Sequence, residues 1–252
     1  MNILKSICPS LLLLLCSCTT PQEYDIFLLI GQSNMAGRGR MIEADKQAID
    51  GVYLLNNAGK VEKAVAPLNK YSTIRKDIRM QQISMGNNFS KEIHEKTGHK
   101  ILLVVNARGG SSIKEWSPNI KDNFCDVAIE RTRTALKYGK LKGILWHQGE
   151  TDSDDPSFYM DSLKVIVTHL RKELKAKTVP FVAGEIAQWH KNNEQFNNML
   201  HHINDHITHS DWVSSKDCSW LKNQNDPHFS REGQLILGKR YADKIWKMAY
   251  QK

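Results

Sequence analysis

Short apolar runs alternate with longer amphipathic segments along the chain from residue 24 onward. The runs lie at 24–30, 51–56, 100–106, 143–147, 180–186 and, more weakly, 211–215. Because successive residues in most of these runs are apolar, both faces of the strands are expected to be covered, as in a parallel sheet flanked by helices. The pattern predicts an α/β protein, a three-layer α/β/α sandwich with a central parallel sheet, formed by one domain over residues 24–252.

Helical periodicity fills the segments between the runs. One predicted helix carries its apolar face at Tyr159, Leu163, Ile166, Leu170 and Leu174. A second, near the end of the chain, carries its apolar face at Leu235, Tyr241, Ile245 and Met248. Asp155-Pro156 predicts the N-cap and first turn of the former.

The first twenty residues have a different character. Lys5 precedes an apolar run at 11–15 that is too short to span a bilayer, so residues 1–17 are predicted to be a cleaved export signal. "LCSC" resembles the bacterial lipoprotein box, which implies lipidation of Cys18 and a tether over 18–23. An ordinary secretory peptide cut a few residues later is the alternative. Both take the mature domain out of the cytoplasm, and the lipoprotein alternative, which is the one expected, places it in the bacterial cell envelope with the membrane contacted only through the lipid anchor.

Composition and charge narrow the class of partner. The chain has 40% hydrophobic and 25% charged residues, as globular proteins do. Removing residues 1–17 takes away one charge and lowers the net charge from +8 to +7. The basic residues are scattered, as in 131–142, without aromatic interleaving or a nucleic-acid motif. A solvated basic surface, and no nucleic-acid partner, is therefore expected.

Two cysteines, Cys125 and Cys218, remain in the domain. An oxidising compartment permits a disulfide between them, and two buried free thiols are an equal alternative. Their separation has none of the spacing of a zinc site.

Four polar clusters follow the apolar runs. They are "GQSN" after the first run, "ARGGSS" after the third, "HQGETD" after the fourth, and "NDPHFS" before the last helix. In open α/β sheets the ligand crevice lies beyond the carboxyl ends of the strands, so these clusters are expected to converge there.

Ser33 ends the first apolar run, with Gly31 allowing a tight turn. A serine hydroxyl is a weak nucleophile until a base takes its proton. Ser33 is therefore either a nucleophile or an ordinary helix N-cap.

His228 supplies the missing base. It stands beside Asp226 in a loop that leads into the last helix, where it could reach Ser33. A simple Asn-Asp-Pro turn is the alternative. The "LHHINDHITH" segment holds four further histidines, and without a zincin signature it predicts a solvated helix face, not a metal site.

"GILWHQGETD" holds more functional groups than solubility requires. His147 could brace the pocket, Gln148 could donate to an oxyanion, and Glu150 could help to hold the base. The alternative for Glu150 is a buried charge paired with an arginine such as Arg108. In "NARGGSS", residues 109 and 110 are glycines whose amides suit an oxyanion hole, or simply a tight turn.

Together, "FLLIGQSNMAGRG", "ARGGSSIKEW", "GILWHQGETD" and "HFSREGQLILGKRYA" resemble the four sequence blocks of the SGNH hydrolase superfamily, over residues 24–249. More narrowly, they resemble the branch of acetylxylan esterases and sialate O-acetylesterases. The resemblance implies a flavodoxin-like fold and ester hydrolysis without metal or cofactor.

Carried over residue by residue, the resemblance makes Ser33 the nucleophile and His228 the general base. The implied oxyanion hole comprises the Ser33 amide, Gly109, Gly110 and Gln148, and the residues expected to bind substrate are Gln32, Asn34 and His147. This chain departs from the family pattern at the acidic residue that orients the histidine. Many relatives place it three residues before the histidine, where this chain has Asn225, while Asp226 stands two before. Either the loop tolerates that shift, or Glu150 orients His228 instead.

The resulting expectation is an exported carbohydrate O-acetylesterase. The amino-acid sequences of these blocks favour acetylated xylan or a related plant polysaccharide over O-acetyl sialic acid as the substrate. A non-catalytic carbohydrate-binding lipoprotein is the alternative of another class, and a lipase would need an apolar lid that the sequence does not show. Trp116, Trp189 and Trp220 either line a glycan subsite or pack in the core.

Overall fold

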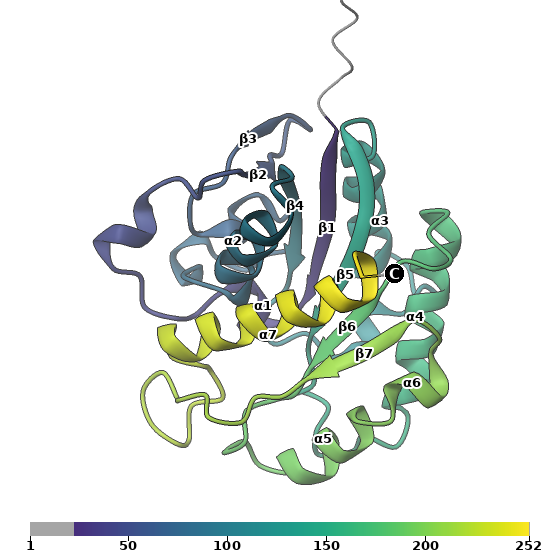
Figure 1. The fold of residues 1–252 in the computed structure, drawn as a ribbon. Helices are drawn as coiled ribbons and strands as arrows, with labels where there is room; N and C mark the ends of the chain where they lie inside the picture. Colours follow the sequence, from purple (N-terminus) through teal and green to yellow (C-terminus); the bar gives the residue numbers. More distant parts are fainter. Residues whose placement is uncertain (1–22, 252) are drawn as a thin grey trace, which may run out of the picture.

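The computed structural model describes residues 23–251, and its centre is a seven-stranded sheet (Figure 1). The strands are β1 (Tyr24–Gly31), β2 (Val52–Leu55), β3 (Val61–Lys63), β4 (Ile101–Ala107), β5 (Gly139–His147), β6 (Phe181–Gly184) and β7 (Ser210–Val213). Their order is β3-β2-β4-β1-β5-β6-β7, and every pairing except β2 with β3 is parallel. The predicted parallel sheet is confirmed. The export signal, Cys18 and most of the tether lie outside the described residues.

The strand that the sequence did not predict is β3. It has three residues and pairs antiparallel with β2 at the edge of the sheet. A strand so short and so little buried carries no long apolar run, so periodicity does not reveal it.

Helices cover both faces of the sheet (Figure 1). They are α1 (Ser33–Ala36), α2 (Met85–Thr97), α3 (Phe124–Ala135), α4 (Tyr159–Glu173), α5 (Asn193–Leu200), α6 (Ile203–His206) and α7 (Arg231–Ala249). Short 3-10 helices lie at Glu43–Lys46, Leu68–Tyr71, Ile78–Met80 and Ile113–Trp116.

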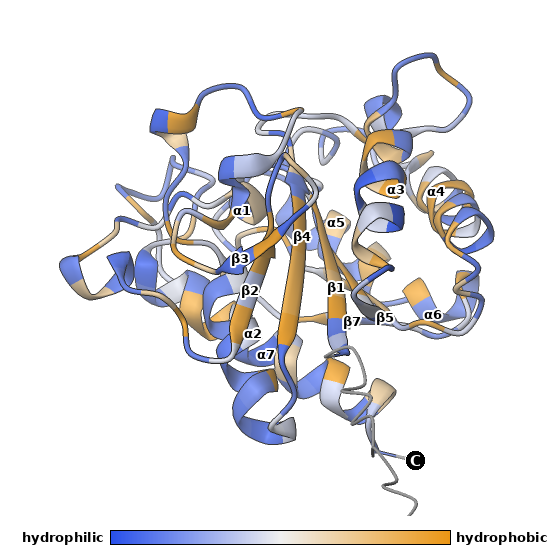
Figure 2. Ribbon diagram, turned by 90° about the horizontal axis from the view of Figure 1, so that it is seen from above, coloured by the Kyte–Doolittle hydropathy of each residue, from blue (hydrophilic) through white to orange (hydrophobic). Residues whose placement is uncertain are grey.

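Alternate residues of β1 pack into two separate cores. Phe27 and Leu29 join the core under α2 and α7, whereas Ile26 and Leu28 join the one under α3 and α4. Figure 2 shows the central strands as the most hydrophobic part of the ribbon, between helices of mixed character. This double coverage explains the unbroken apolar runs and confirms the predicted three-layer fold.

The start of α4 differs from the prediction. The helix begins at Tyr159, with Phe158 at its N-cap. Asp155 instead accepts hydrogen bonds from the amide and hydroxyl of Ser157, at 3.3 and 2.7 Å. The aspartate therefore stabilises a separate turn before the helix, and the predicted cap is wrong.

Both cysteines are free thiols on opposite faces of the sheet. Cys125 belongs to the core under α3 and α4, and Cys218 packs against the core under α7. The sheet therefore separates the two thiols and excludes the disulfide alternative. Burial raises the pKa of Cys218 to about 11, which keeps it protonated near neutral pH.

In the part of the chain that the structure describes, none of the helices is both long enough and apolar enough to cross a bilayer.

Candidate active site

Ser33 is positioned by the end of β1. Gly31 has φ +138°, and a Cβ there would lie 2.1 Å from the carbonyl oxygen of His147 on the adjacent β5, so only glycine fits. Gln32 then donates its amide hydrogen to the same carbonyl, at 2.9 Å. Because the chain leaves β1 and β5 toward opposite edges of the sheet, the crevice of an open α/β sheet is expected at this point. Ser33 lies in it.

The structure brings Ser33, His228 and Asp226 into one line. His228 Nε2 lies 3.0 Å from Ser33 Oγ, and His228 Nδ1 lies 2.6 Å from Asp226 Oδ1. Asp226 Oδ1 also accepts the backbone amide of His228, at 3.0 Å. The carboxylate thus folds back onto its own loop, which is how an acid only two residues before the histidine still reaches the ring.

The loop that contains Asp226 and His228, here called the histidine loop, is held on both sides. Leu221 donates its amide to the His228 carbonyl at 2.8 Å, and Trp220 forms a bridge with Phe229. Trp189 Nε1 donates to the Asp226 carbonyl at 2.7 Å. These contacts fix the loop before a substrate arrives, which is the preorganisation that a catalytic base requires.

Glu150 does not orient His228. Its Oε1 accepts a 2.6 Å hydrogen bond from Asn34, and none of its hydrogen bonds among residues 23–251 reaches His228. Nor does it pair with Arg108, whose guanidinium donates to the Ile74 carbonyl instead. Direct orientation of His228 by Glu150 and pairing of Glu150 with Arg108 are therefore both wrong, and Glu150 supports the loop that carries His228 only through Asn34. Burial raises the pKa of its carboxyl, and Oε2 is buried without a partner.

Asn34 is a clasp for the histidine loop and not a substrate ligand. It is fully buried, donates to Glu150 and to the Pro227 carbonyl at 3.1 Å, and accepts the Phe229 amide at 3.2 Å. Its polar groups are all used within the protein. The expectation that it binds substrate is corrected accordingly.

Gln148 has no hydrogen left for an oxyanion. The side chain is fully buried, and Nε2 contacts Gln32 Oε1 at 3.1 Å, the Ser111 carbonyl at 3.0 Å and Asp152 Oδ2. Gln32 Oε1 is itself occupied, because it also accepts the Gly149 amide at 3.2 Å. Gln148 therefore braces the loop after β5. Gln32 still borders the catalytic hollow, though its carbonyl is engaged.

His147 is also internal. It is fully buried, and its Nδ1 lies 3.1 Å from the hydroxyl of Tyr241, which donates to the Trp146 carbonyl at 2.7 Å. Burial lowers the pKa of His147 to about 3, so the ring stays neutral. It braces the end of β5 and does not contact substrate, contrary to the expectation.

Of the two glycines, Gly109 lies closer to Ser33. A Cβ on Gly109 would lie 3.6 Å from Ser33 Cβ and 2.6 Å from Arg38 Nη2, whereas a Cβ on Gly110 would face Lys76 Nζ at 3.4 Å. Within residues 23–251, the amides of Ser33 and Gly109 donate no hydrogen bond. Both are thus free to serve a developing oxyanion.

The hollow around Ser33 has a volume of about 340 Å³ and a basic rim. Arg38, Lys76 and His190 line it, and the sequence alone predicted a role for none of them. Arg38 belongs to the "GQSNMAGRG" block, but its orientation depends on a distant loop, since Nη1 donates to the Met80 carbonyl at 3.0 Å. Sequence could therefore supply the residue but not its direction.

Several charges set the protonation of His228. Burial is the largest influence and lowers its pKa below 6.5, Asp226 opposes this, and Arg38 and Lys222 lower it further. The ring is therefore neutral near pH 7 and ready to accept the Ser33 proton.

We expect kcat/KM for p-nitrophenyl acetate to rise with pH to a plateau, with a midpoint below pH 6.5, because only neutral His228 acts as base. Lys222→Gln removes a positive charge that opposes the imidazolium, so the midpoint should move to higher pH by a few tenths of a pH unit. Stopped or continuous assays at low salt from pH 4.5 to 9, made on the wild-type enzyme and on Lys222→Gln, measure the two midpoints. A midpoint that falls in the variant would contradict this assignment of the base.

The four histidines of "LHHINDHITH" do not converge. His201 Nε2 contacts Glu185 at 2.5 Å and its ring stacks on Trp212 at 3.8 Å, whereas His202 pairs with Asp205. His202, His206 and His209 are exposed. The chain from 23 to 251 holds no group of three or more potential ligands able to bind a metal ion.

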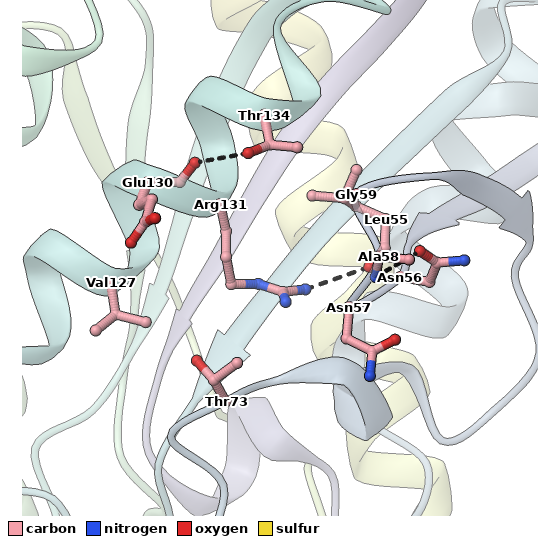
Figure 3. Close-up of a pocket in the computed structure, with 10 residues that line it drawn as sticks. All are labelled: Leu55, Asn56, Asn57, Ala58, Gly59, Thr73, Val127, Glu130, Arg131 and Thr134. Atoms are coloured by element: carbon pink, nitrogen blue, oxygen red, sulfur yellow. Dashed lines mark hydrogen bonds between the residues drawn. The ribbon is translucent and has the colours of Figure 1, made fainter.

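A separate hollow of about 350 Å³ lies between the β2–β3 turn and α3 (Figure 3). Arg131 points into it from α3, but its guanidinium already donates to the carbonyls of Tyr71 and Leu55, at 2.7 and 3.2 Å. Its lining has no histidine that could activate a nucleophile. The hollow at Ser33, by contrast, is lined by both a serine and a histidine that contact each other.

Comparison with known proteins agrees with this geometry. Residues 23–247 match the family described as carbohydrate esterase, sialic acid-specific acetylesterase. An Arabidopsis thaliana protein, named as a probable carbohydrate esterase, is 27% identical over 189 residues, which cover 64% of this chain and 68% of that protein.

Three solved structures share the fold. The structure of the same Arabidopsis thaliana protein has a TM-score of 0.80 at 22% identity and covers 91% of this chain and 100% of its own. NanS has a TM-score of 0.72 at 16% identity, covering 92% and 99%. A carbohydrate acetylesterase from Xanthomonas citri has a TM-score of 0.64 at 19% identity, covering 90% and 57%.

Proposed function

We propose that this chain, which belongs to the family described as carbohydrate esterase, sialic acid-specific acetylesterase, removes O-acetyl groups from acetylated xylan or a related plant polysaccharide. The family supports carbohydrate acetylesterase activity in general. The observation that carries the proposal is the hydrogen-bonded line from Ser33 through His228 to Asp226, at the carboxyl end of β1. The choice of xylan rests on the resemblance of the segments "FLLIGQSNMAGRG" and "GGSSIKEW" to acetylxylan esterases.

The geometry supports a two-step hydrolysis. Ser33 Oγ attacks the acetyl carbonyl carbon while His228 Nε2 takes its proton, and Asp226 stabilises the imidazolium. The amides of Ser33 and Gly109 stabilise the tetrahedral oxyanion. Collapse of the intermediate expels the sugar alkoxide, which takes the proton from His228. Water, deprotonated by His228, then attacks the acyl-enzyme, and acetate leaves as Ser33 regains its proton.

A second candidate substrate is O-acetyl sialic acid. Besides the description of the family, the rim of the hollow favours it, because Arg38 and Lys76 could attract a sugar carboxylate. A third candidate function is that of a non-catalytic carbohydrate-binding protein. It does not require the 3.0 Å contact between His228 Nε2 and Ser33 Oγ, since a binder needs no activated serine.

Export and anchoring through Cys18 are part of the same proposal. They are supported by the sequence of residues 1–18. Tyr24 begins β1 at the end of the strand opposite Ser33. An anchor preceding Tyr24 would therefore leave the domain from the end of the sheet remote from the site.

The test is acetate release by residues 19–252 from acetylated xylan and from O-acetyl sialic acid side by side, with Ser33→Ala as the blank. Release from xylan is the expected result. Release from sialic acid alone would replace the proposed substrate with the second candidate. No release from either, with Ser33 also unlabelled by a fluorophosphonate, would favour the binding protein.

A further inference from the structure

A second hollow of about 300 Å³ adjoins the catalytic one. It is lined by Trp189, His190, Lys191, Gln224, Asn225 and Pro227. His190 and Pro227 border both hollows, and Pro227 immediately precedes His228. A molecule bound in one hollow can therefore extend directly into the other.

Trp189 forms a rigid aromatic wall of this second hollow. Its Nε1 is tied to the Asp226 carbonyl, and its ring meets Phe229 and Trp220 edge to face, with centroids 5.4 and 6.0 Å apart. Trp220 is 49% exposed, an unusual degree for tryptophan, whereas Trp116 is fully buried and only packs. The electron-rich face of an indole ring attracts the C–H groups of a sugar ring.

Two side-chain amides, those of Gln224 and Asn225, also line this hollow. Gln224 and Asn225 are exposed, and neither side chain has a hydrogen-bond partner in the described residues. Their backbone is nevertheless held, because Asn223 accepts the amides of Asn225 and Asp226 at 2.9 and 3.0 Å. A side-chain amide both donates and accepts, as a sugar hydroxyl does. The held backbone thus places two side-chain amides where they could bond sugar hydroxyls.

The charge of this hollow is partly neutralised. Lys191 Nζ lies 3.2 Å from Asp154, so this lysine already has an acidic partner. An aromatic wall with amides and a paired lysine suits a neutral, hydroxyl-rich ring better than a free anion.

We propose that the second hollow is a subsite for the sugar residue next to the acetylated one, so that the substrate is a glycan chain and not a monosaccharide. This inference rests on the proposed esterase function. Both hollows lie at the small end of the range of roughly 300–1,000 Å³ for ligand pockets, which suits one ring in each.

The test compares kcat/KM for acetylated xylo-oligosaccharides and for p-nitrophenyl acetate, which is too small to reach the second hollow. In Gln224→Ala/Asn225→Ala, the ratio of the two values should fall about tenfold, because two hydrogen bonds to the second ring are lost. Asn57→Ala, in the separate hollow of Figure 3, is the matched control and should leave the ratio at the wild-type value. An unchanged ratio in the double variant would overturn the subsite.

A binding measurement keeps this test independent of catalysis. Calorimetry on Ser33→Ala protein with unacetylated xylo-oligosaccharide should give a dissociation constant that the double substitution raises about tenfold. If the wild-type enzyme hydrolysed no ester at all, the proposed function would fail while this titration still decided the subsite. Binding that is equal with and without the two amides would refute it.

Discussion

Replacing Ser33 by alanine is expected to lower kcat for acetyl esters by at least about 10⁴-fold, because the hydroxyl that would form the acyl-enzyme is gone. The fold should persist. Ser33 Oγ contacts only His228 Nε2 among the hydrogen bonds of residues 23–251, and that nitrogen faces the open hollow, where water can replace the lost partner. Acetate release measures the first effect, and the midpoint of thermal unfolding should move by no more than a few degrees.

A serine with no proposed role supplies the control. Ser162 on α4 has no side-chain hydrogen bond in the described part of the chain, so Ser162→Ala should keep wild-type turnover and unfolding temperature. Fluorophosphonate labelling should be lost only in Ser33→Ala. A Ser33→Ala enzyme that still hydrolyses acetyl esters would contradict the proposed mechanism.

Asp226→Asn is expected to lower kcat/KM by about 10³- to 10⁴-fold, whereas Glu150→Gln should cost less than tenfold. Asp226 Oδ1 faces His228 Nδ1 at 2.6 Å, and an amide there no longer stabilises the imidazolium or fixes the productive tautomer. Glutamine at 150 keeps the oxygen that accepts from Asn34, and the pKa of the wild-type carboxyl is already raised by burial. Steady-state kinetics of the two variants measures the difference.

Glu150→Ala adds a check on the clasp. It removes the acceptor of Asn34 and should lower activity more than Glu150→Gln does, through the position of the histidine loop. If Glu150→Gln proved as inactive as Asp226→Asn, Glu150 would have a direct part in proton transfer that its contacts do not predict.

The sheet was predictable because the apolar residues that mark a buried strand lie within that strand's own sequence. A strand covered on both faces favours an apolar run, so five of the seven strands could be predicted clearly from the sequence. β7, which contains Asp211, was predicted only weakly, and edge strand β3, with three little-buried residues, was not predicted. Ser33 was predictable for a related reason, because a polar cluster directly after an apolar run falls at the carboxyl end of a strand, where ligands bind. His228 does not follow an apolar run directly, and it was predicted from its place beside Asp226 in the loop before the last helix.

The roles of the other polar residues were decided only by the tertiary structure. Sequence places a side chain at the end of a strand but does not say which way it points or what it bonds. Gln148 bonds Gln32 across 116 positions, and Asn34 bonds Phe229 across 195. These partners meet only when the loops converge. Side chains that were candidates for the substrate were thereby turned inward to hold the loops, and Asp226, not Glu150, was left beside the histidine.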